Sequence, residues 1–207
     1  MPSPIPAMFI ADAPGLDFLN SIATPVNVTV DWIDGGEGLL DWLDQAGLVP
    51  ADVLAAMRSG AMPGELDGLA EQVRDLREWF RAFVQEHKGA PLTAASVGQL
   101  DRLNRLLARD EGFHRVVALD TGAIGVESTR RWTSPESLLL PIADAMAQLV
   151  AKEDFSYVKA CEGPTCTLLF ADHTRGHVRR WCSMAACGNR AKQLAHRHRV
   201  AAQQVGL

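Results

Sequence analysis

Four cysteines, all in the last quarter of the chain, carry the clearest chemical pattern in the sequence. Cys161 and Cys166 form one close pair and Cys182 and Cys187 form another, each with four intervening residues, and fifteen residues separate the two pairs. Two close pairs joined by a loop of this length are typical of four thiolates that converge on one tetrahedral metal ion. Zinc favours four soft, charged ligands and needs no open position in a structural role. The spacing therefore predicts one structural Zn²⁺ per chain.

Other interpretations of the cysteines stay open from the spacing alone. Two disulfides would need an oxidising compartment, an iron–sulfur cluster would use the same four thiolates, and four unrelated buried thiols are a further alternative. His173 and His177 lie between the pairs and could replace a cysteine ligand. Because four cysteines are available, we expect both histidines to be surface residues.

Charge is distributed as unevenly as the cysteines. The chain has 207 residues and a formal charge of −5, with an isoelectric point near 5.7. Residues 1–151 hold 11 Lys or Arg against 21 Asp or Glu, whereas the remaining 56 residues hold 9 against 4. The acidic total argues against a chain that coats nucleic acid along its whole length. The basic end indicates an attached binding module, or else a terminal helix whose cations are only solvated.

The basic residues gather around the predicted metal site and along the helix expected after it. Arg and Lys in such places neutralise phosphates, and Arg also bonds guanine edges. For Arg179 and Arg190 the alternative is a structural role, in which they bond carbonyl groups or pair with Asp172. The candidate nucleic-acid-binding residues are Arg175, Arg179, Arg180, Arg190, Lys192, Arg197 and Arg199.

The rest of the chain supplies the elements that must position this site. Apolar residues three or four apart predict helices, the clearest over 65–88 and others over 15–21, 39–47, 51–57, 93–107 and 134–152. Residues 113–119 and 124–132 predict a β-hairpin, and 24–30 a short strand or a loop. We expect a mostly α fold with a small β element (α+β). It would comprise a helical domain at 1–150 and a four-cysteine zinc finger at 155–207, built as a β-hairpin followed by a helix.

The predicted helical domain shows no chemistry of its own. It lacks GxGxxG, GxxxxGK[ST], GxSxG and HExxH patterns, so we expect no enzymatic activity. Polar or aromatic residues that could line a ligand pocket there are Asn20, Arg130, Arg131 and Trp132. No stretch approaches the ~18 consecutive apolar residues of a membrane helix, and the N-terminus lacks the pattern of a secretory signal. We expect a soluble, cytoplasmic protein.

A longer motif surrounds the second cysteine pair. Phe170-x-Asp172-x-Thr174, Arg179-Arg180-Trp181-Cys182-Ser183-Met184 and Cys187-Gly188-Asn189-Arg190-x-Lys192 together resemble the CGNR zinc finger, and the first cysteine pair also fits. Segments 16–21 and 39–48 resemble the ABATE domain, the usual N-terminal partner of that finger in proposed stress-induced transcriptional regulators of bacteria. The resemblance implies a zinc-finger DNA-binding regulator whose acidic helical domain dimerises or senses a signal.

Two other functions stay open. The finger could be a zinc-stabilised module that contacts protein or RNA, with the acidic domain covering the basic finger. Alternatively, the N-terminal domain could be an enzyme or bind a small molecule. The salt dependence of binding distinguishes DNA binding from an apolar protein interface. Phosphate contacts weaken steeply as ionic strength rises, whereas apolar protein interfaces weaken little. Candidate partners are DNA, a second copy of the chain and an unidentified small-molecule effector.

Overall fold

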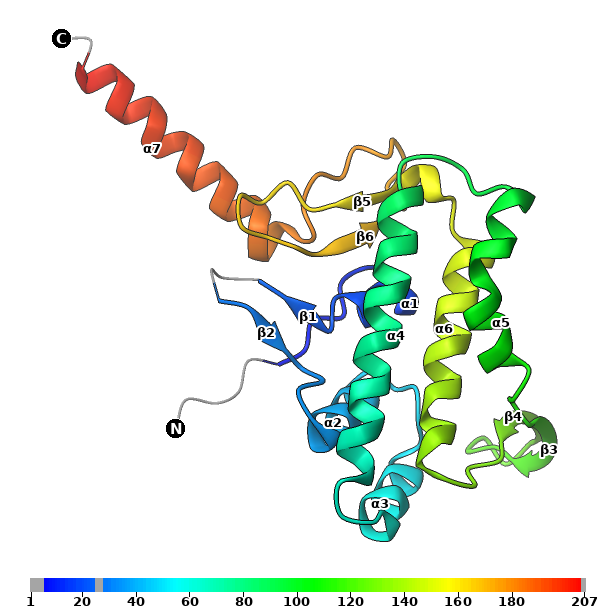
Figure 1. The fold of residues 1–207 in the computed structure, drawn as a ribbon. Coiled ribbons are helices and arrows are strands. Elements are labelled where there is room, and N and C mark those ends of the chain that lie inside the picture. Colours follow the sequence, from blue (N-terminus) through cyan, green and yellow to red (C-terminus); the bar gives the residue numbers. More distant parts are fainter. Residues whose placement is uncertain (1–5, 25–27, 206–207) are drawn as a thin grey trace.

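The computed structural model describes residues 6–24 and 28–205, with the side chains of all of these except 198–199 and 201–205. This part of the chain forms seven α-helices and three antiparallel two-stranded sheets (Figure 1). The mostly helical α+β fold predicted from the sequence is confirmed. None of the described helices combines the length and the apolar content that crossing a bilayer requires.

A bundle of helices makes up the first two thirds of the chain. Its members are α1 (Pro14–Leu19), α2 (Gly36–Gln45), α3 (Ala51–Gly60), α4 (Glu65–His87), α5 (Asp101–Leu107) and α6 (Leu139–Lys152). The long helix α4 buries the face that its apolar spacing predicts, including Val73, Leu76 and Phe80. Helix α1 contacts both α4 and α6. It lies against α6 so closely that a Cβ at Gly15 would be 2.7 Å from the carbonyl oxygen of Ala145.

The predicted secondary structure holds, with differences at the ends of elements. The helix expected over 93–107 begins as a 3₁₀ segment, η1 (Ala94–Leu100), before α5, and the one expected from 134 begins as η2 (Pro135–Leu138) before α6. The expected hairpin is β3 (Gly112–Ala118) with β4 (Ile124–Arg130). A small ladder of β1 (Ile22–Ala23) with β2 (Val30–Asp31) flanks the segment expected as a strand or loop over 24–30, of which 25–27 lie outside the described residues.

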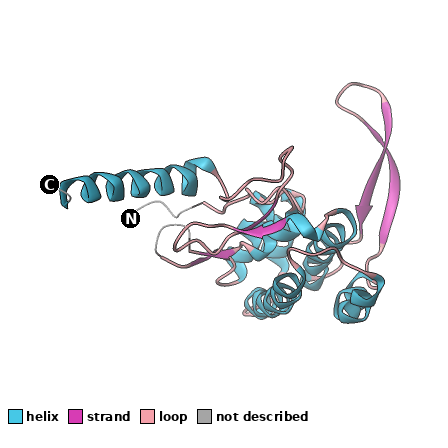
Figure 2. Cartoon of the chain, turned by 90° about the horizontal axis from the view of Figure 1, so that it is seen from above, coloured by secondary structure: helices cyan, strands magenta, loops and turns pink. Residues whose placement is uncertain are grey.

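The first elements of the C-terminal region pack against the helical body. Its elements are η3 (Phe155–Tyr157), β5 (Val158–Ala160), β6 (Leu169–Ala171), the π-helical turn η4 (Met184–Gly188) and α7 (Asn189–Val205). Strand β6 packs on α1, and Phe155 and Phe170 belong to the same buried cluster as the bundle residues. One continuous core therefore joins the bundle to the base of the finger, whereas α7 projects away from it (Figures 1 and 2).

Candidate metal centre and nucleic-acid interface

Four sulfur atoms from two separate turns meet at the loop end of the β5–β6 hairpin. Cys161 follows β5 and Cys166 lies in the loop before β6, while Cys182 and Cys187 come from the segment that leads into α7. The four Sγ atoms all lie within 4.8 Å of one another, and those of Cys166 and Cys182 are 3.9 Å apart. A tetrahedral site with Zn–S distances of about 2.3 Å has S–S edges of about 3.8 Å. The donor set therefore fits one zinc ion.

The backbone of the first cysteine loop folds closely over the sulfurs. The N–H groups of Gly163 and Cys182 donate to Cys161 Sγ at 3.4 Å and 3.2 Å. A Cβ at Gly163 would lie 3.0 Å from Cys187 Sγ and 3.0 Å from Cys166 Cβ, so this position has little room for a side chain. Amide donors to a ligating sulfur stabilise its thiolate form and fix its orientation.

The crowding of the four thiols separates their pKa values. A hydrogen bond from Cys182 lowers the pKa of Cys166 to about 5. The bond to Cys166 and burial raise the pKa of Cys182 well above its ordinary value, and burial raises the pKa of Cys187 to about 12. Cys166 therefore loses its proton readily, and deprotonation of the neighbouring cysteines is then disfavoured. A divalent cation removes that penalty, because it binds the deprotonated form of each cysteine.

The loop between β6 and Cys182 is organised around the buried carboxylate of Asp172, whose side chain is fully buried. It accepts hydrogen bonds from Lys159 Nζ at 2.7 Å, from Thr174 Oγ1 at 2.6 Å and from the backbone N–H of Arg179 at 2.9 Å. Burial raises the pKa of Asp172, but these bonds outweigh it and hold the pKa well below the usual range. The carboxylate thus stays charged and fixes the path of the chain toward the second cysteine pair.

Arg179 ties this loop to the N-terminal segment. Its guanidinium donates to the Ile10 carbonyl at 2.9 Å and pairs with Asp12 at 2.5 Å. It also donates to the carbonyl oxygens of Trp181 and Cys182. One side chain therefore spans from a residue next to the metal site to the start of the helical body. This is the structural role that the sequence left open for Arg179.

Two family models match the chain. One is ABATE, described as "Putative stress-induced transcription regulator", which matches residues 12–153, and the other is the CGNR zinc finger, which matches residues 157–200. The chain belongs to the ABATE family and ends in a CGNR zinc finger. No protein in a curated collection matches it. The clustered cysteines are accordingly the zinc site of the CGNR finger, with one Zn²⁺ as its cofactor.

The two histidines between the cysteine pairs, His173 and His177, lie outside the ligand set, which in the described residues consists of the four cysteines. His173 is exposed and its Nε2 lies 2.7 Å from a carboxylate oxygen of Glu153. His177 stacks on the ring of Tyr157, with the ring centroids 3.4 Å apart, and its Nδ1 lies 2.7 Å from the carbonyl oxygen of Asp172. Both histidines hold the loop in place rather than the metal.

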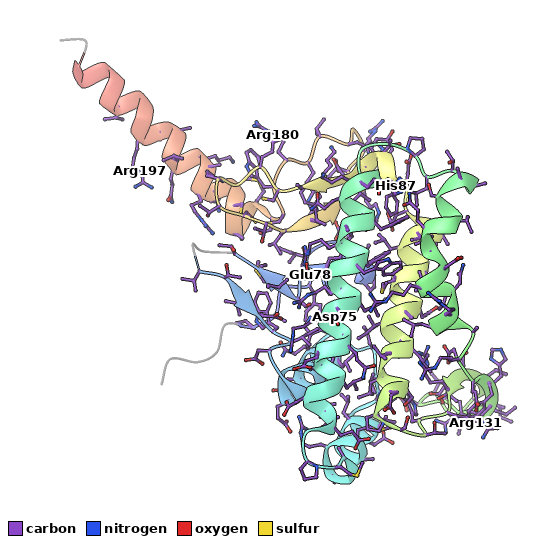
Figure 3. The ribbon with its side chains drawn as sticks, viewed as in Figure 1. Asp75, Glu78, His87, Arg131, Arg180 and Arg197 are labelled. Atoms are coloured by element: carbon purple, nitrogen blue, oxygen red, sulfur yellow. The ribbon has the colours of Figure 1, made fainter. Side chains whose placement is uncertain are left out.

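The other predicted cations of the CGNR finger fall into two groups. Arg180, labelled in Figure 3, is exposed, pairs with Glu162 at 2.6 Å and lies over the ring of Trp181, and Arg190 is half-buried at the start of α7. Arg175 in the loop and Lys192 and Arg197 on α7 are also exposed, whereas the side chain of Arg199 lies outside the described residues. The cysteine loop and the first half of α7 border a pocket whose lining includes Cys166, Arg190 and Leu194.

The C-terminal part of the finger contains no acidic residue. Asp172 is the last acidic residue of the sequence, so residues 173–207 carry seven Arg or Lys and no Asp or Glu. Most of α7, including Arg197, extends beyond the body of the protein (Figures 1 and 3). The described side chains of α7 from Lys192 to Arg197 are exposed to solvent. Two cations of the loop are paired instead, Arg179 with Asp12 of the N-terminal segment and Arg180 with Glu162 of the finger itself.

The four residues predicted to line a pocket occupy two separate regions. Asn20 is buried, and its amide bonds the backbone N–H and C=O of Leu169 at 2.9 Å and 2.8 Å. Arg130 instead pairs with Asp110 at 3.4 Å and lies 5.6 Å from the ring centre of Trp132, at the base of the β3–β4 hairpin. Arg131 is exposed there (Figure 3). Asn20 is a structural anchor that the sequence pattern missed, because its partner lies 149 residues away.

Proposed function

We propose that the protein is a DNA-binding transcriptional regulator that holds duplex DNA through α7 and the adjoining finger loop. The observation that carries this proposal is the projecting helix α7, which belongs to a stretch of 35 residues without a single carboxylate side chain. The cations of this helix attract phosphate, and no carboxylate side chain on it opposes them. In this proposal the protein binds DNA and is not an enzyme.

The dimensions of α7 suit a DNA groove. Its 17 residues give a length of about 26 Å, and a helix about 10–12 Å across enters a major groove about 12 Å wide. Lys192, Gln193 and Arg197 are exposed along it. A polar helix of this length is marginally stable by itself in water, so contact with DNA would stabilise it. Zinc would fix the base of α7, because Cys187 lies two residues before the start of the helix at Asn189.

The helical body would direct DNA to the finger by repulsion. Exposed carboxylates follow one side of α4, namely Asp67, Glu71, Asp75 and Glu78, of which Figure 3 labels the last two. Like charge disfavours phosphate at this surface, and α7 provides the attractive one. In this proposal the body would also be the part that responds to stress or to a small signal, in a family whose description is that of a stress-induced transcription regulator.

The test is DNA affinity of the zinc-loaded full chain at several salt concentrations. Removal of two phosphate contacts in the double variant Lys192→Ala, Arg197→Ala should weaken binding about 10- to 100-fold and reduce the salt slope by about 2. Arg58→Ala is the matched control, because Arg58 pairs with Glu37 and Asp41 on the helical body and should leave binding unchanged.

Two results would overturn the proposal. One is a zinc-loaded protein that binds no duplex at low salt. The other is a double variant with the wild-type affinity and salt slope. Binding of RNA or of a protein with little salt dependence would instead favour a contact module of another kind.

A further inference from the structure

One of the four zinc ligands is accessible from solvent. Three of them, Cys161, Cys182 and Cys187, keep only 8%, 0% and 3% of their surface exposed. Cys166 is instead half-buried. Bound zinc holds all four sulfurs as thiolates, and the oxidation of a cysteine follows its thiolate character and its exposure. Cys166 is therefore the ligand that an oxidant from solvent meets first.

The pocket beside the metal site opens onto this same ligand. Of the four cysteines, its lining includes Cys166 and Cys187, so the pocket lies next to the metal position rather than between all four sulfurs. Two arginines of α7 also line it, Arg190 and Arg197, the second of which is labelled in Figure 3. Cationic groups around a partly exposed thiolate are typical of reactive cysteines, whereas inert structural cysteines are buried. The surroundings of Cys166 match the reactive kind.

A second sulfur lies in position to complete an oxidation. The Sγ atoms of Cys166 and Cys182 are 3.9 Å apart, although the two residues come from different turns of the finger. Cysteines that respond to oxidants are often placed next to a second cysteine, which attacks the oxidised sulfur and forms a disulfide. Cys182 is fully buried, so it would react with Cys166 rather than with the oxidant itself.

We propose that Cys166 is a peroxide-sensitive switch, which releases zinc from the finger when it forms a disulfide with Cys182. In the first step the Cys166 thiolate attacks one oxygen of hydrogen peroxide, the O–O bond breaks, and hydroxide leaves and takes up a proton to form water. In the second step the Cys182 thiolate attacks the sulfur of the Cys166 sulfenic acid. The S–S bond forms, the S–O bond breaks, and a second hydroxide leaves and takes up a proton. The two sulfurs together supply the two electrons that reduce peroxide to two molecules of water.

The disulfide would detach α7 from the cysteine loop. It leaves Cys161 and Cys187 as the remaining ligands, and a structural zinc site needs four. Cys187 lies two residues before α7, so loss of the ion would free the base of this helix. If the proposed function holds, peroxide would therefore weaken DNA binding and would be a signal to which the protein responds.

Zinc release from the full chain in the absence of DNA tests the switch independently of DNA binding. A chelating dye should report release of zinc after ~1 mM hydrogen peroxide is added to the zinc-loaded protein, with one disulfide formed for each zinc ion released. Fragmentation of disulfide-linked peptides in a mass spectrometer should identify Cys166–Cys182 as the first linkage. Dithiothreitol and fresh zinc should restore the zinc-loaded state.

A variant that narrows the pocket tests the route to Cys166. Ala191 is half-buried and lines the pocket, so Ala191→Phe should slow zinc release about 5- to 10-fold. Ala195→Phe is the matched control, because it makes the same substitution one turn further along α7, at an exposed position outside the pocket lining. It should release zinc at the wild-type rate. Before peroxide is added, both variants should bind one zinc ion per chain and show the wild-type helix content.

Three results would overturn the proposal: zinc that stays bound in the wild type after several hours in ~1 mM peroxide, a first disulfide other than Cys166–Cys182, or equal rates of release from the two phenylalanine variants. The first two results are measured on the wild-type chain, so they do not depend on how the variants fold.

Discussion

Replacement of Asn20 by Ala should destabilise the bundle and the zinc finger together. The amide of Asn20 acts as an extra strand residue, because it accepts from the N–H of Leu169 and donates to its C=O on the outer edge of β6. Asn20 ends α1 and Leu169 begins the strand that leads into the finger loop. These two hydrogen bonds therefore join the two parts of the shared core.

The structure sets the size of the effect. Both bonds are short, at 2.9 Å and 2.8 Å, and both are buried. Alanine would leave two buried backbone groups without partners, at about 1–3 kcal/mol each. Water entering the vacated space recovers part of this, so we expect a loss of about 3 kcal/mol in the free energy of unfolding. For a chain of this length, that lowers Tm by about 6–12 °C.

The assay follows thermal unfolding of the zinc-loaded chain by two signals, helix content from circular dichroism and zinc release to a chelating dye. In the wild type both transitions should coincide, and in Asn20→Ala both should move down together. Asn104→Ala on the exposed side of α5 is the control, with an expected change of less than about 0.5 kcal/mol.

A loss smaller than about 1 kcal/mol would refute the reasoning, because it would mean that the two bonds contribute no more than exposed ones. Zinc release that shifts alone, while the helices unfold at the wild-type temperature, would show that the core is not continuous from α1 to β6.

Two further predictions concern the metal and pH. Cys166→Ser should abolish zinc binding and make the segment after residue 160 accessible to protease, because the free energy of metal binding stabilises the fold of a small zinc finger. A variant that retains one zinc per chain and the wild-type resistance to protease would contradict this prediction. Burial raises the pKa of Asp17 from 3.8 to about 6, so the folded state binds this proton more tightly and stability should decline as pH rises from about 4 to about 6. Asp17→Asn retains an acceptor for the N–H groups of Ile10 and Ala11. In urea titrations at several pH values, the free energy of unfolding of this variant should fall by about 1–2 kcal/mol less than that of the wild type between pH ~4 and ~6. An equal dependence of the free energy of unfolding on pH in both proteins would rule out Asp17 as the cause.

The sequence pattern predicted the helices, the hairpin and the cysteine turns, which depend mainly on residues close together in the chain. Six apolar residues of α4 step by three or four because a helix turns every 3.6 residues, namely Leu66, Leu69, Val73, Leu76, Phe80 and Phe83. The observed helix Glu65–His87 contains all of them. The β3–β4 hairpin forms around Gly122, whose φ of 79° suits a tight turn. The cysteine spacing predicted the metal site correctly, because each close pair needs only its own turn to present two sulfurs.

The roles of individual polar residues depend on contacts far apart in the chain. Arg179 looked like a phosphate ligand from its sequence neighbours, but its partners Ile10 and Asp12 lie almost 170 residues away. Asn20 resembled a pocket residue, but its partner Leu169 lies 149 residues away. Net charge along the chain does not distinguish a cation that is paired within the fold from one that faces solvent.

Residue type and short-range spacing were enough to single out the four cysteines as metal ligands, to predict a mostly helical fold and to locate the acid-free C-terminal stretch. That the base of the finger shares the core of the helical body became visible only in the folded chain. The tertiary structure also separated α7, which projects with its cations exposed, from the loop arginines that are held in ion pairs. These features depend on which surfaces meet across more than a hundred residues, and burial is a property of the packed chain rather than of any single segment.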